Sequence, residues 1–188
     1  MQQKKIILAS RSPRRVELLA QLGVQCEIVP ADIDESSLKG EDPAIYVQRL
    51  AKAKALAIAA THAGIGLAIL AADTTVALGQ EILGKPADAD EAMAMLSRLS
   101  GSVHLVHTAV AVYQDGEVQC LLNTTRVEMM QVPEEALQDY VASGEPMDKA
   151  GAYGIQGRAG AWIVRIDGSY SGVMGLPLHE TAQLLHAW

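Results

Sequence analysis

The chain has 188 residues, of which 49% are hydrophobic and 20% are charged, a composition typical of a soluble globular protein. Its formal net charge of -7 at pH 7 disfavours binding to a nucleic acid polymer or to an anionic membrane surface, because both depend on a basic surface. The length is sufficient for one sizeable core, so we expect a single domain over residues 1–188.

Targeting and redox features are sparse. The start "MQQKKIILAS" has an apolar part too short for a signal peptide, and it is better interpreted as a first buried strand. No apolar run has the length of a membrane span. Cys26 and Cys120 are far apart and belong to no CxxC or Cys/His pattern, so neither a disulfide nor a zinc site is expected. These features predict a cytoplasmic protein.

The first half of the chain predicts alternating strands and helices. In chain order these are a strand at Lys4–Ala9, a helix at Pro13–Leu22 after the N-cap Ser12, a strand at Cys26–Val29, an acidic turn "ADIDESS", a long helix from Asp42 and Pro43, and an apolar central strand "GLAILAADTTVALG". The long helix should turn inward a stripe made of Tyr46, Leu50, Ala53 and Ala57. At 100° per residue, Lys54 lies on that inward side and Lys52 nearly opposite.

The second half predicts more helices and a long hairpin. Its elements are a helix at Ala89–Leu99, a β-hairpin over residues 104–129 around the turn Asp115–Gly116, a helix at Pro133–Ser143, an irregular glycine-rich segment, a strand over residues 161–167 and a final helix at Pro177–His186. The hairpin is antiparallel and the order is not strictly βαβ. We therefore expect an α/β fold, with a mixed β-sheet flanked by helices on both faces.

Two arginines stand where a helix disfavours them. In "SRSPRRVELL", Arg14 and Arg15 fall in the first helical turn, where the partial positive charge of the helix dipole is concentrated. A phosphate at this helix N-terminus would account for them, because backbone N–H groups and guanidinium groups would bind it together. Two solvated surface arginines are the alternative.

Candidate carboxylates occur in two places. Asp73 in "LAADTTV" is interpreted as the end of an apolar strand, where functional residues of sheet proteins gather, although a turn-forming Asp is the alternative. Asp32, Asp34 and Glu35 offer a second carboxylate, unless they only form a solvated acidic loop.

Two lysine positions suggest further cations of the site. An inward Lys54 either faces an anionic ligand or extends its ammonium to the edge of the core. Lys149 lies in the glycine-rich "DKAGAYGIQG", in which Tyr153 can stack on a planar group and Gln156 can read its hydrogen-bonding edge. A purely structural loop is equally compatible with this composition.

Two patterns are rejected as functional sites. "GQEILGK" resembles part of a P-loop, but Pro86 follows it and brings neither a hydroxyl for Mg²⁺ nor a backbone N–H, which leaves Lys85 as a single positioned cation. His104 and His107, three apart in a strand, point to opposite faces and are expected to be structural.

Six motifs together resemble the Maf family of nucleoside triphosphate pyrophosphatases. They are "SRSPRRVELL", "AADTTV", "GKP", "LSGSVHLVHTAV", "SGEPMDKAGAYGIQG" and "GVMGLPL", in the family's order and over nearly the whole chain. The resemblance implies a Maf/ITPase-like α/β fold with a substrate cleft, usually in a homodimer. It also implies hydrolysis of a nucleoside triphosphate to monophosphate and pyrophosphate with a divalent cation, Mg²⁺ or Mn²⁺.

The same resemblance implies roles for individual residues. Asp73 matches the catalytic aspartate and, with Glu35, the metal-binding carboxylates, and Arg14, Arg15, Lys54 and Lys85 match phosphate-binding positions. Arg14, Thr74 and Gln156 match the positions that separate a dTTP/UTP branch from a 7-methyl-GTP branch, and this chain resembles the first. Ser10, Lys149 and Tyr153 are expected to line the same cleft.

The function expected is therefore hydrolysis of dTTP and UTP, and of modified pyrimidine nucleotides, as housekeeping of the nucleotide pool. Two alternatives stay open. One is a 7-methyl-GTP pyrophosphatase, and the other is a non-catalytic nucleotide-binding regulator of septum formation.

Overall fold

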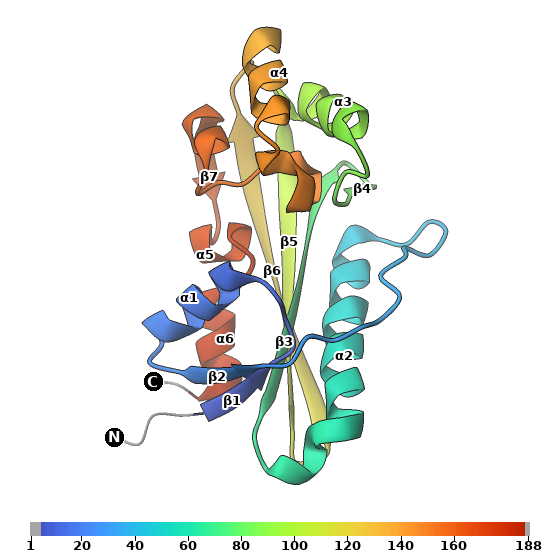
Figure 1. The fold of residues 1–188 in the computed structure, drawn as a ribbon, viewed down its shortest axis with the longest axis vertical. Helices are drawn as coiled ribbons and strands as arrows, with labels where there is room; N and C mark the ends of the chain where they lie inside the picture. The colour runs from blue at the N-terminus through green and yellow to red at the C-terminus, as the bar shows by residue number, and fades with distance from the viewer. Residues whose placement is uncertain (1–4, 187–188) are drawn as a thin grey trace.

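The computed structural model describes residues 5–186 and contains a mixed β-sheet of seven strands (Figure 1). The order across the sheet is β2-β1-β3-β5-β6-β7, and β4 pairs with β3. The strands are β1 (Lys5–Leu8), β2 (Gln25–Ile28), β3 (Ile69–Leu78), β4 (Glu81–Leu83), β5 (Val103–Gln114), β6 (Glu117–Met129) and β7 (Ile163–Asp167). β1 runs parallel to β2 and β3, and the remaining pairs are antiparallel.

Helices cover both faces of the sheet. They are α1 (Pro13–Gln21), α2 (Pro43–His62), α3 (Ala89–Leu99), α4 (Glu134–Ala142), α5 (Tyr170–Val173) and α6 (Leu178–Leu185), with short 3₁₀ turns η1 (Ala63–Ile65), η2 (Glu145–Asp148), η3 (Ala150–Ala152) and η4 (Arg158–Trp162). In Figure 1, α2 lies on one side of the strands, α1 and α6 lie on the other, and α3 and α4 lie at the top. The predicted fold class, a mixed sheet flanked by helices, is confirmed.

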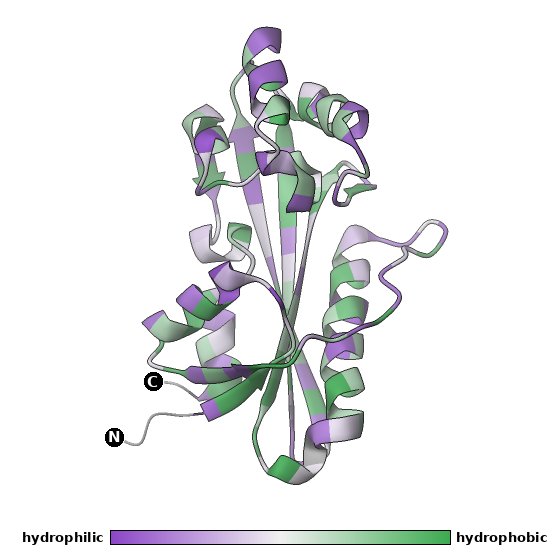
Figure 2. Ribbon diagram, in the orientation of Figure 1, coloured by the Kyte–Doolittle hydropathy of each residue, from purple (hydrophilic) through white to green (hydrophobic). Residues whose placement is uncertain are grey.

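The helices pack on the sheet through three apolar clusters. One joins α2 to the sheet face that carries Ile69 and Ala71, and a second joins α1 and α6 to the opposite face at Leu70 and Ala72. The third lies under α3 and α4, near the start of β5 at Val106. Figure 2 shows green, hydrophobic stretches along the strands and on the helices that cover them. No helix within residues 5–186 is long and apolar enough to cross a membrane.

Most predicted elements are confirmed to within a few residues, and the hairpin turn Asp115–Gly116 has the positive φ angles of a two-residue turn. Lys4, the predicted start of the first strand, lies outside the described residues. The predicted inward stripe of α2 is partly wrong: Leu50 is buried, but Ala53 and Ala57 are only half-buried. The face that packs on the sheet is rotated toward Val47, Ala51, Ala55 and Ile58. The short elements β4 and α5 were not predicted.

A change of partner along one edge of β3 creates the space for the site. β1 pairs with β3 at Ile69 and Leu70, and β4 pairs with it from Val76 onward. Between these pairings, and within the described part of the chain, residues 71–75 have no strand beside them on this edge. Asp73 therefore lies in the middle of β3, and the prediction that it ends a strand is wrong. The apolar run continues past Asp73 because β3 exchanges β1 for β4 as its neighbour.

Candidate active site

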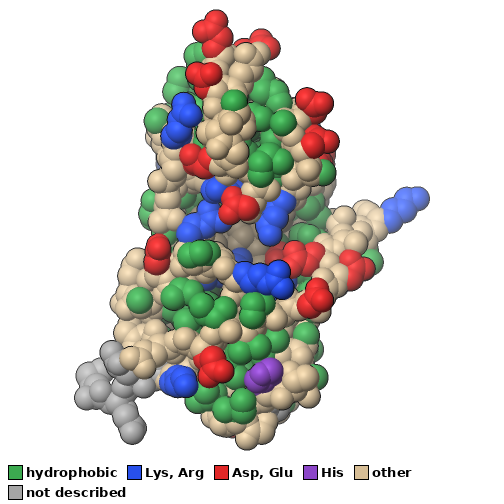
Figure 3. Space-filling model, viewed as in Figure 1, with side chains coloured by type: hydrophobic (Ala, Val, Ile, Leu, Met, Phe, Trp, Pro, Cys, Tyr) green, Lys and Arg blue, Asp and Glu red, His purple; other side chains and the backbone are tan. Residues whose placement is uncertain are grey.

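A cavity of about 980 Å³ opens at this gap in the sheet. Its walls come from the start of α1, the loop before α2, the middle of α2 and β3, the turn after β4, and the glycine-rich segment after α4. Figure 3 shows blue Lys and Arg side chains gathered around a hollow in the middle of the molecule, with red carboxylates among them. The volume falls at the top of the roughly 300–1,000 Å³ common for small-molecule sites.

Arg15 is held by three oxygens that carry no charge. Its Nε donates to the Gly175 carbonyl oxygen at 2.8 Å, Nη1 donates to Ser10 Oγ at 3.1 Å, and Nη2 donates to Thr74 Oγ1 at 3.3 Å. A guanidinium has five N–H donors, so two remain after these contacts. Burial lowers the pKa of Arg15, while the charge of Asp73 opposes this. The neighbours thus fix the orientation of the cation without neutralising it.

Asp73 shares the ammonium group of Lys54 with Glu35. Lys54 Nζ lies 2.7 Å from Asp73 Oδ1 and 2.8 Å from Glu35 Oε1. The side chains of Lys54 and Asp73 are only 10% and 9% exposed, whereas that of Glu35 is 49% exposed. The prediction that Lys54 faces inward is confirmed, and Lys52 is exposed on the other side of α2. Glu35 is the member of the acidic loop that joins this pair, while Asp34 accepts hydrogen bonds from Ser36.

The pKa values of the two carboxylates of this cluster shift in opposite directions. Burial raises the pKa of Asp73, and the charge and hydrogen bond of Lys54 oppose this effect without cancelling it. Burial acts in the same direction on Glu35, but the hydrogen bond and charge of Lys54 outweigh it, so the pKa of Glu35 lies below its usual value. The raised pKa makes Asp73 a better proton acceptor than an ordinary aspartate.

Side chains of α2 anchor the loop that carries Glu35. Tyr46 Oη donates to the Glu35 carbonyl oxygen at 2.9 Å, and Arg49 Nη2 donates to the Ser36 carbonyl oxygen at 3.0 Å. Burial and the charges of Asp73 and Glu35 raise the pKa of Tyr46 to about 12, so its hydroxyl is a proton donor at neutral pH. Arg49 also binds Glu41 through two nitrogens at 2.6 and 2.7 Å. Neither Tyr46 nor Arg49 was predicted as a residue of the site, because each acts through a neighbour.

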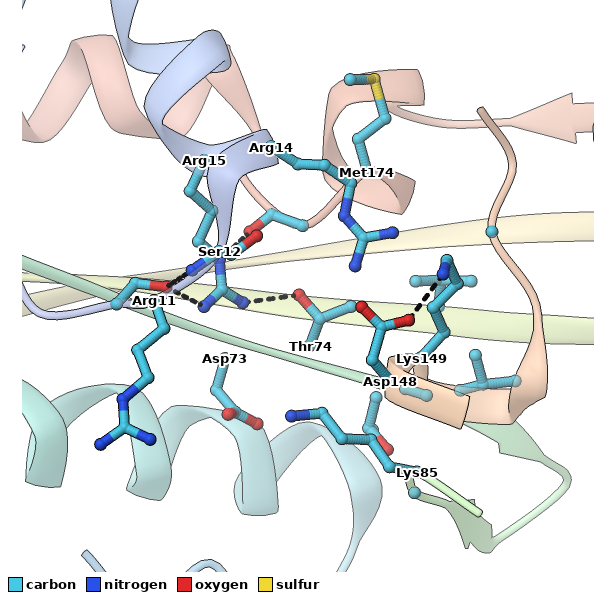
Figure 4. A pocket seen from close by; sticks show the side chains of 18 of the residues that line it. Arg11, Ser12, Arg14, Arg15, Asp73, Thr74, Lys85, Asp148, Lys149 and Met174 are labelled. Carbon is cyan, nitrogen blue, oxygen red and sulfur yellow. Dashed lines mark hydrogen bonds and ion pairs between the residues drawn. The ribbon is translucent and has the colours of Figure 1, made fainter. Parts of the chain in front are cut away.

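Several cations around the cavity lack a carboxylate partner. Within residues 5–186, Arg14, Arg15 and Lys85 form no ion pair. Figure 4 shows these three side chains around the same space, with Asp73 beside them. Lys149 differs, since its Nζ binds Asp148 Oδ1 and the Glu145 carbonyl oxygen, both at 2.6 Å. The cavity therefore presents positive charge that a small anion can neutralise.

The glycine-rich segment is held from behind by buried aromatic residues. Tyr153 Oη lies 2.7 Å from His104 Nε2, and the two rings pack edge to face. Tyr140 Oη accepts a hydrogen bond from the Gly154 N–H and donates one to Glu145 Oε1. A Cβ at Gly154 would lie 2.7 Å from the end of the Lys149 side chain, so the backbone of the segment passes close to that lysine. These contacts fix the segment that carries Gln156 at the cavity wall.

Both histidines have the structural environments that were predicted. His104 and His107 lie on opposite faces of β5, and His107 Nδ1 binds Thr124 Oγ1 at 2.9 Å. Cys26 and Cys120 are free thiols.

The donor set fits a hard divalent cation. Mg²⁺ usually takes one or two carboxylates and completes its shell with water and substrate phosphate. Asp73 and Glu35 supply two carboxylates that already converge on one cation, the Lys54 ammonium. Within the described residues, no group of three or more His, Cys, Asp or Glu side chains is arranged to hold a metal by itself.

Residues 5–188 match the sequence model of a family described as Maf-like protein. The chain belongs to the Maf family. It is 54% identical to a protein of Methylobacillus flagellatus over 96% of this chain and 91% of that protein. It is 51% identical to a protein of Chromobacterium violaceum over 96% of this chain and 93% of that one, and 51% identical to a protein of Myxococcus xanthus over 97% and 92%. Each of these relatives is named dTTP/UTP pyrophosphatase.

The structure brings the predicted site residues of this Maf-family protein to one cavity. The lining includes Ser10, Arg14, Arg15, Glu35, Lys54, Asp73, Thr74, Lys85, Lys149, Tyr153 and Gln156. Their individual roles stay predictions. The lining also contains Arg11, Tyr46, Glu145 and Asp148, which the sequence patterns did not assign to the site.

Proposed function

We propose that this protein hydrolyses dTTP and UTP to the nucleoside monophosphate and pyrophosphate. The names of relatives that are about half identical over nearly the full length support this substrate choice. The observation that carries the chemistry is the set of cations without carboxylate partners, Arg14, Arg15 and Lys85, around the carboxylate of Asp73.

The triphosphate is proposed to bind between α1 and the turn after β4. Arg14 and Arg15 stand in the first turn of α1, where backbone N–H groups and the helix dipole also favour an anion. Lys85 approaches from the other side of the cavity. These groups stabilise the negative charge that develops on the transferring and departing oxygens, so their contribution is positioning and electrostatics.

Asp73 is the proposed acceptor of a proton from the attacking water. Its raised pKa makes it more basic than an ordinary aspartate, and Lys54 holds the carboxylate in place at 2.7 Å. The water attacks the α-phosphorus and pyrophosphate departs. Asp73 and Glu35 would hold Mg²⁺ or Mn²⁺, which when bound supplies charge neutralisation on the phosphate oxygens.

Gln156 is the proposed reader of the base. Its side chain is exposed at the cavity wall, and its amide offers both an N–H donor group and a carbonyl acceptor. The O4 and N3–H groups of uracil and thymine match that pair. Arg14 and Thr74 are the other proposed specificity residues. Three further properties stay predictions. They are a homodimeric state, a cytoplasmic location and the removal of unwanted nucleotides from the nucleotide pool.

The proposal is tested by incubating the purified protein with dTTP, UTP, CTP, 7-methyl-GTP, ATP and GTP, with Mg²⁺ or with a chelator. Pyrophosphate and monophosphate are followed together. Mg²⁺-dependent release from dTTP and UTP is expected. Turnover chiefly of 7-methyl-GTP would contradict the substrate assignment, and binding without any pyrophosphate would favour the regulator.

A further inference from the structure

A chain of hydrogen bonds leads from the cavity into the sheet. It begins at Arg15 Nη2, which donates to Thr74 Oγ1 at 3.3 Å. Thr74 Oγ1 lies 2.9 Å from Thr108 Oγ1, directly across the β3–β5 pairing. Thr108 Oγ1 lies 2.8 Å from the Gly172 carbonyl oxygen in α5. The chain thus joins a cation of the cavity to a backbone carbonyl of α5.

The two ends of the chain determine the direction of every bond in it. A carbonyl oxygen only accepts, so the single hydroxyl proton of Thr108 points to Gly172. Thr108 must then accept from Thr74, which uses the single proton of Thr74. A guanidinium only donates, so Thr74 accepts from Arg15. The proton of Thr74 therefore points away from the cavity.

The local packing keeps this arrangement in place. Thr108 is fully buried, so water does not offer it a different acceptor. Gly172 is held by its N–H, which donates to Ser169 Oγ at 3.0 Å. The Gly172 carbonyl group thus stays aimed at Thr108.

We propose that Thr108 is a positioning residue that makes Thr74 a pure hydrogen-bond acceptor toward the nucleotide. Thr74 is half-buried and lines the cavity, and its hydroxyl oxygen has one lone pair left after Arg15. An ionised phosphate oxygen has no proton to offer and is repelled there. Thr74 accordingly accepts a hydrogen bond from an N–H or O–H group of the nucleotide.

This inference rests on the proposed function, and it narrows what Thr74 recognises. dTTP and UTP share two such donors, the N3–H of the base and the 3′-hydroxyl of the sugar. CTP keeps the 3′-hydroxyl but has a bare lone pair at N3. If the N3–H group donates to Thr74 in place of the Gln156 amide oxygen, two acceptors face each other in the CTP complex, which leaves both without a partner.

The test compares Thr108→Val with Thr108→Ser. Valine is close in shape to threonine and removes the hydroxyl, so the Thr74 proton is free to turn toward the cavity. Serine keeps the hydroxyl and serves as the matched control. Each enzyme is assayed for kcat/KM with UTP, CTP and 3′-deoxy-UTP, and melting curves verify that both variants are folded.

In Thr108→Val the preference for UTP over CTP is expected to fall by about tenfold or more, while Thr108→Ser stays within about threefold of the native enzyme. If the sugar is the donor, the preference for UTP over 3′-deoxy-UTP falls instead. Unchanged preferences in a folded Thr108→Val variant would overturn the inference. A loss of equal size in Thr108→Ser would also overturn it, because the hydroxyl would then not be the cause.

Binding separates this inference from the proposed function. The affinities of the α,β-methylene analogues of UTP, CTP and 3′-deoxy-UTP are measured by calorimetry, where no turnover is needed. A native enzyme that cleaves no nucleotide disproves the proposed function, and the binding preferences of the two variants still decide the role of Thr108. The inference fails if the native protein binds the three analogues equally.

Discussion

Protonation of His104 is expected to destabilise the fold below neutral pH. His104 is almost completely buried behind the cavity, where burial lowers its pKa to about 4. An unfolded histidine titrates near pH 6.5. As the pH falls between these two values, His104 takes up a proton in the unfolded chain but not in the folded chain. The free energy of unfolding therefore decreases.

The size of this effect follows from the gap of about 2.5 pH units between the two pKa values, which is worth about 3 kcal/mol. A domain of ordinary stability has about 5–15 kcal/mol in total, so the loss is easily measured. His104→Gln removes the titration and keeps a side chain that can bind the Tyr153 hydroxyl. This variant should therefore lose about 3 kcal/mol less than the native protein between pH 7 and pH 4.

The assay is urea unfolding at several pH values, followed by tryptophan fluorescence. Trp162 is a suitable reporter because it packs against Tyr140, 5.0 Å between ring centres, in the apolar cluster that also contains Tyr153. His62→Gln, at the more exposed end of α2, is the matched control and should follow the native protein. Equal acid sensitivity in the native protein and His104→Gln would refute the reasoning.

Three further predictions concern the cavity. Arg15→Lys keeps the charge but not the fork of donors, so kcat/KM for UTP should fall by about tenfold or more in steady-state kinetics, with unchanged circular dichroism as evidence of folding. Lys54→Met removes the ammonium that keeps burial from raising the pKa of Asp73 further. The acid limb of the pH profile of kcat/KM should therefore move to higher pH. An unmoved limb would exclude Asp73 as the titrating group. Gln156→Ala should raise KM for UTP by about tenfold and leave kcat closer to native, whereas a change confined to kcat would place the amide away from the base.

The sequence was sufficient for most of the elements and for many of the charged residues that line the cavity. Apolar periodicity located the strands and helices, and the turn Asp115–Gly116 located the hairpin. Helical geometry separated Lys54 from Lys52. These features are local, so they can be recognised without knowledge of the tertiary packing.

Features that depend on tertiary contacts were missed. Asp73 was placed at a strand end because nothing local shows that β3 exchanges β1 for β4. The buried face of α2 differs from the predicted stripe, because contacts with the sheet decide which small residues of the helix are covered. Tyr46 binds the backbone of Glu35, and Thr108 binds a carbonyl 64 residues away, so neither contact leaves a local pattern.

The most direct test of the account measures pyrophosphate release from UTP and dTTP by the native protein and by Asp73→Asn. Binding of the α,β-methylene analogue of UTP is measured alongside. The account predicts Mg²⁺-dependent release by the native protein and loss of release in Asp73→Asn, with the analogue still bound by the cations of the cavity. Undiminished release by Asp73→Asn would contradict it.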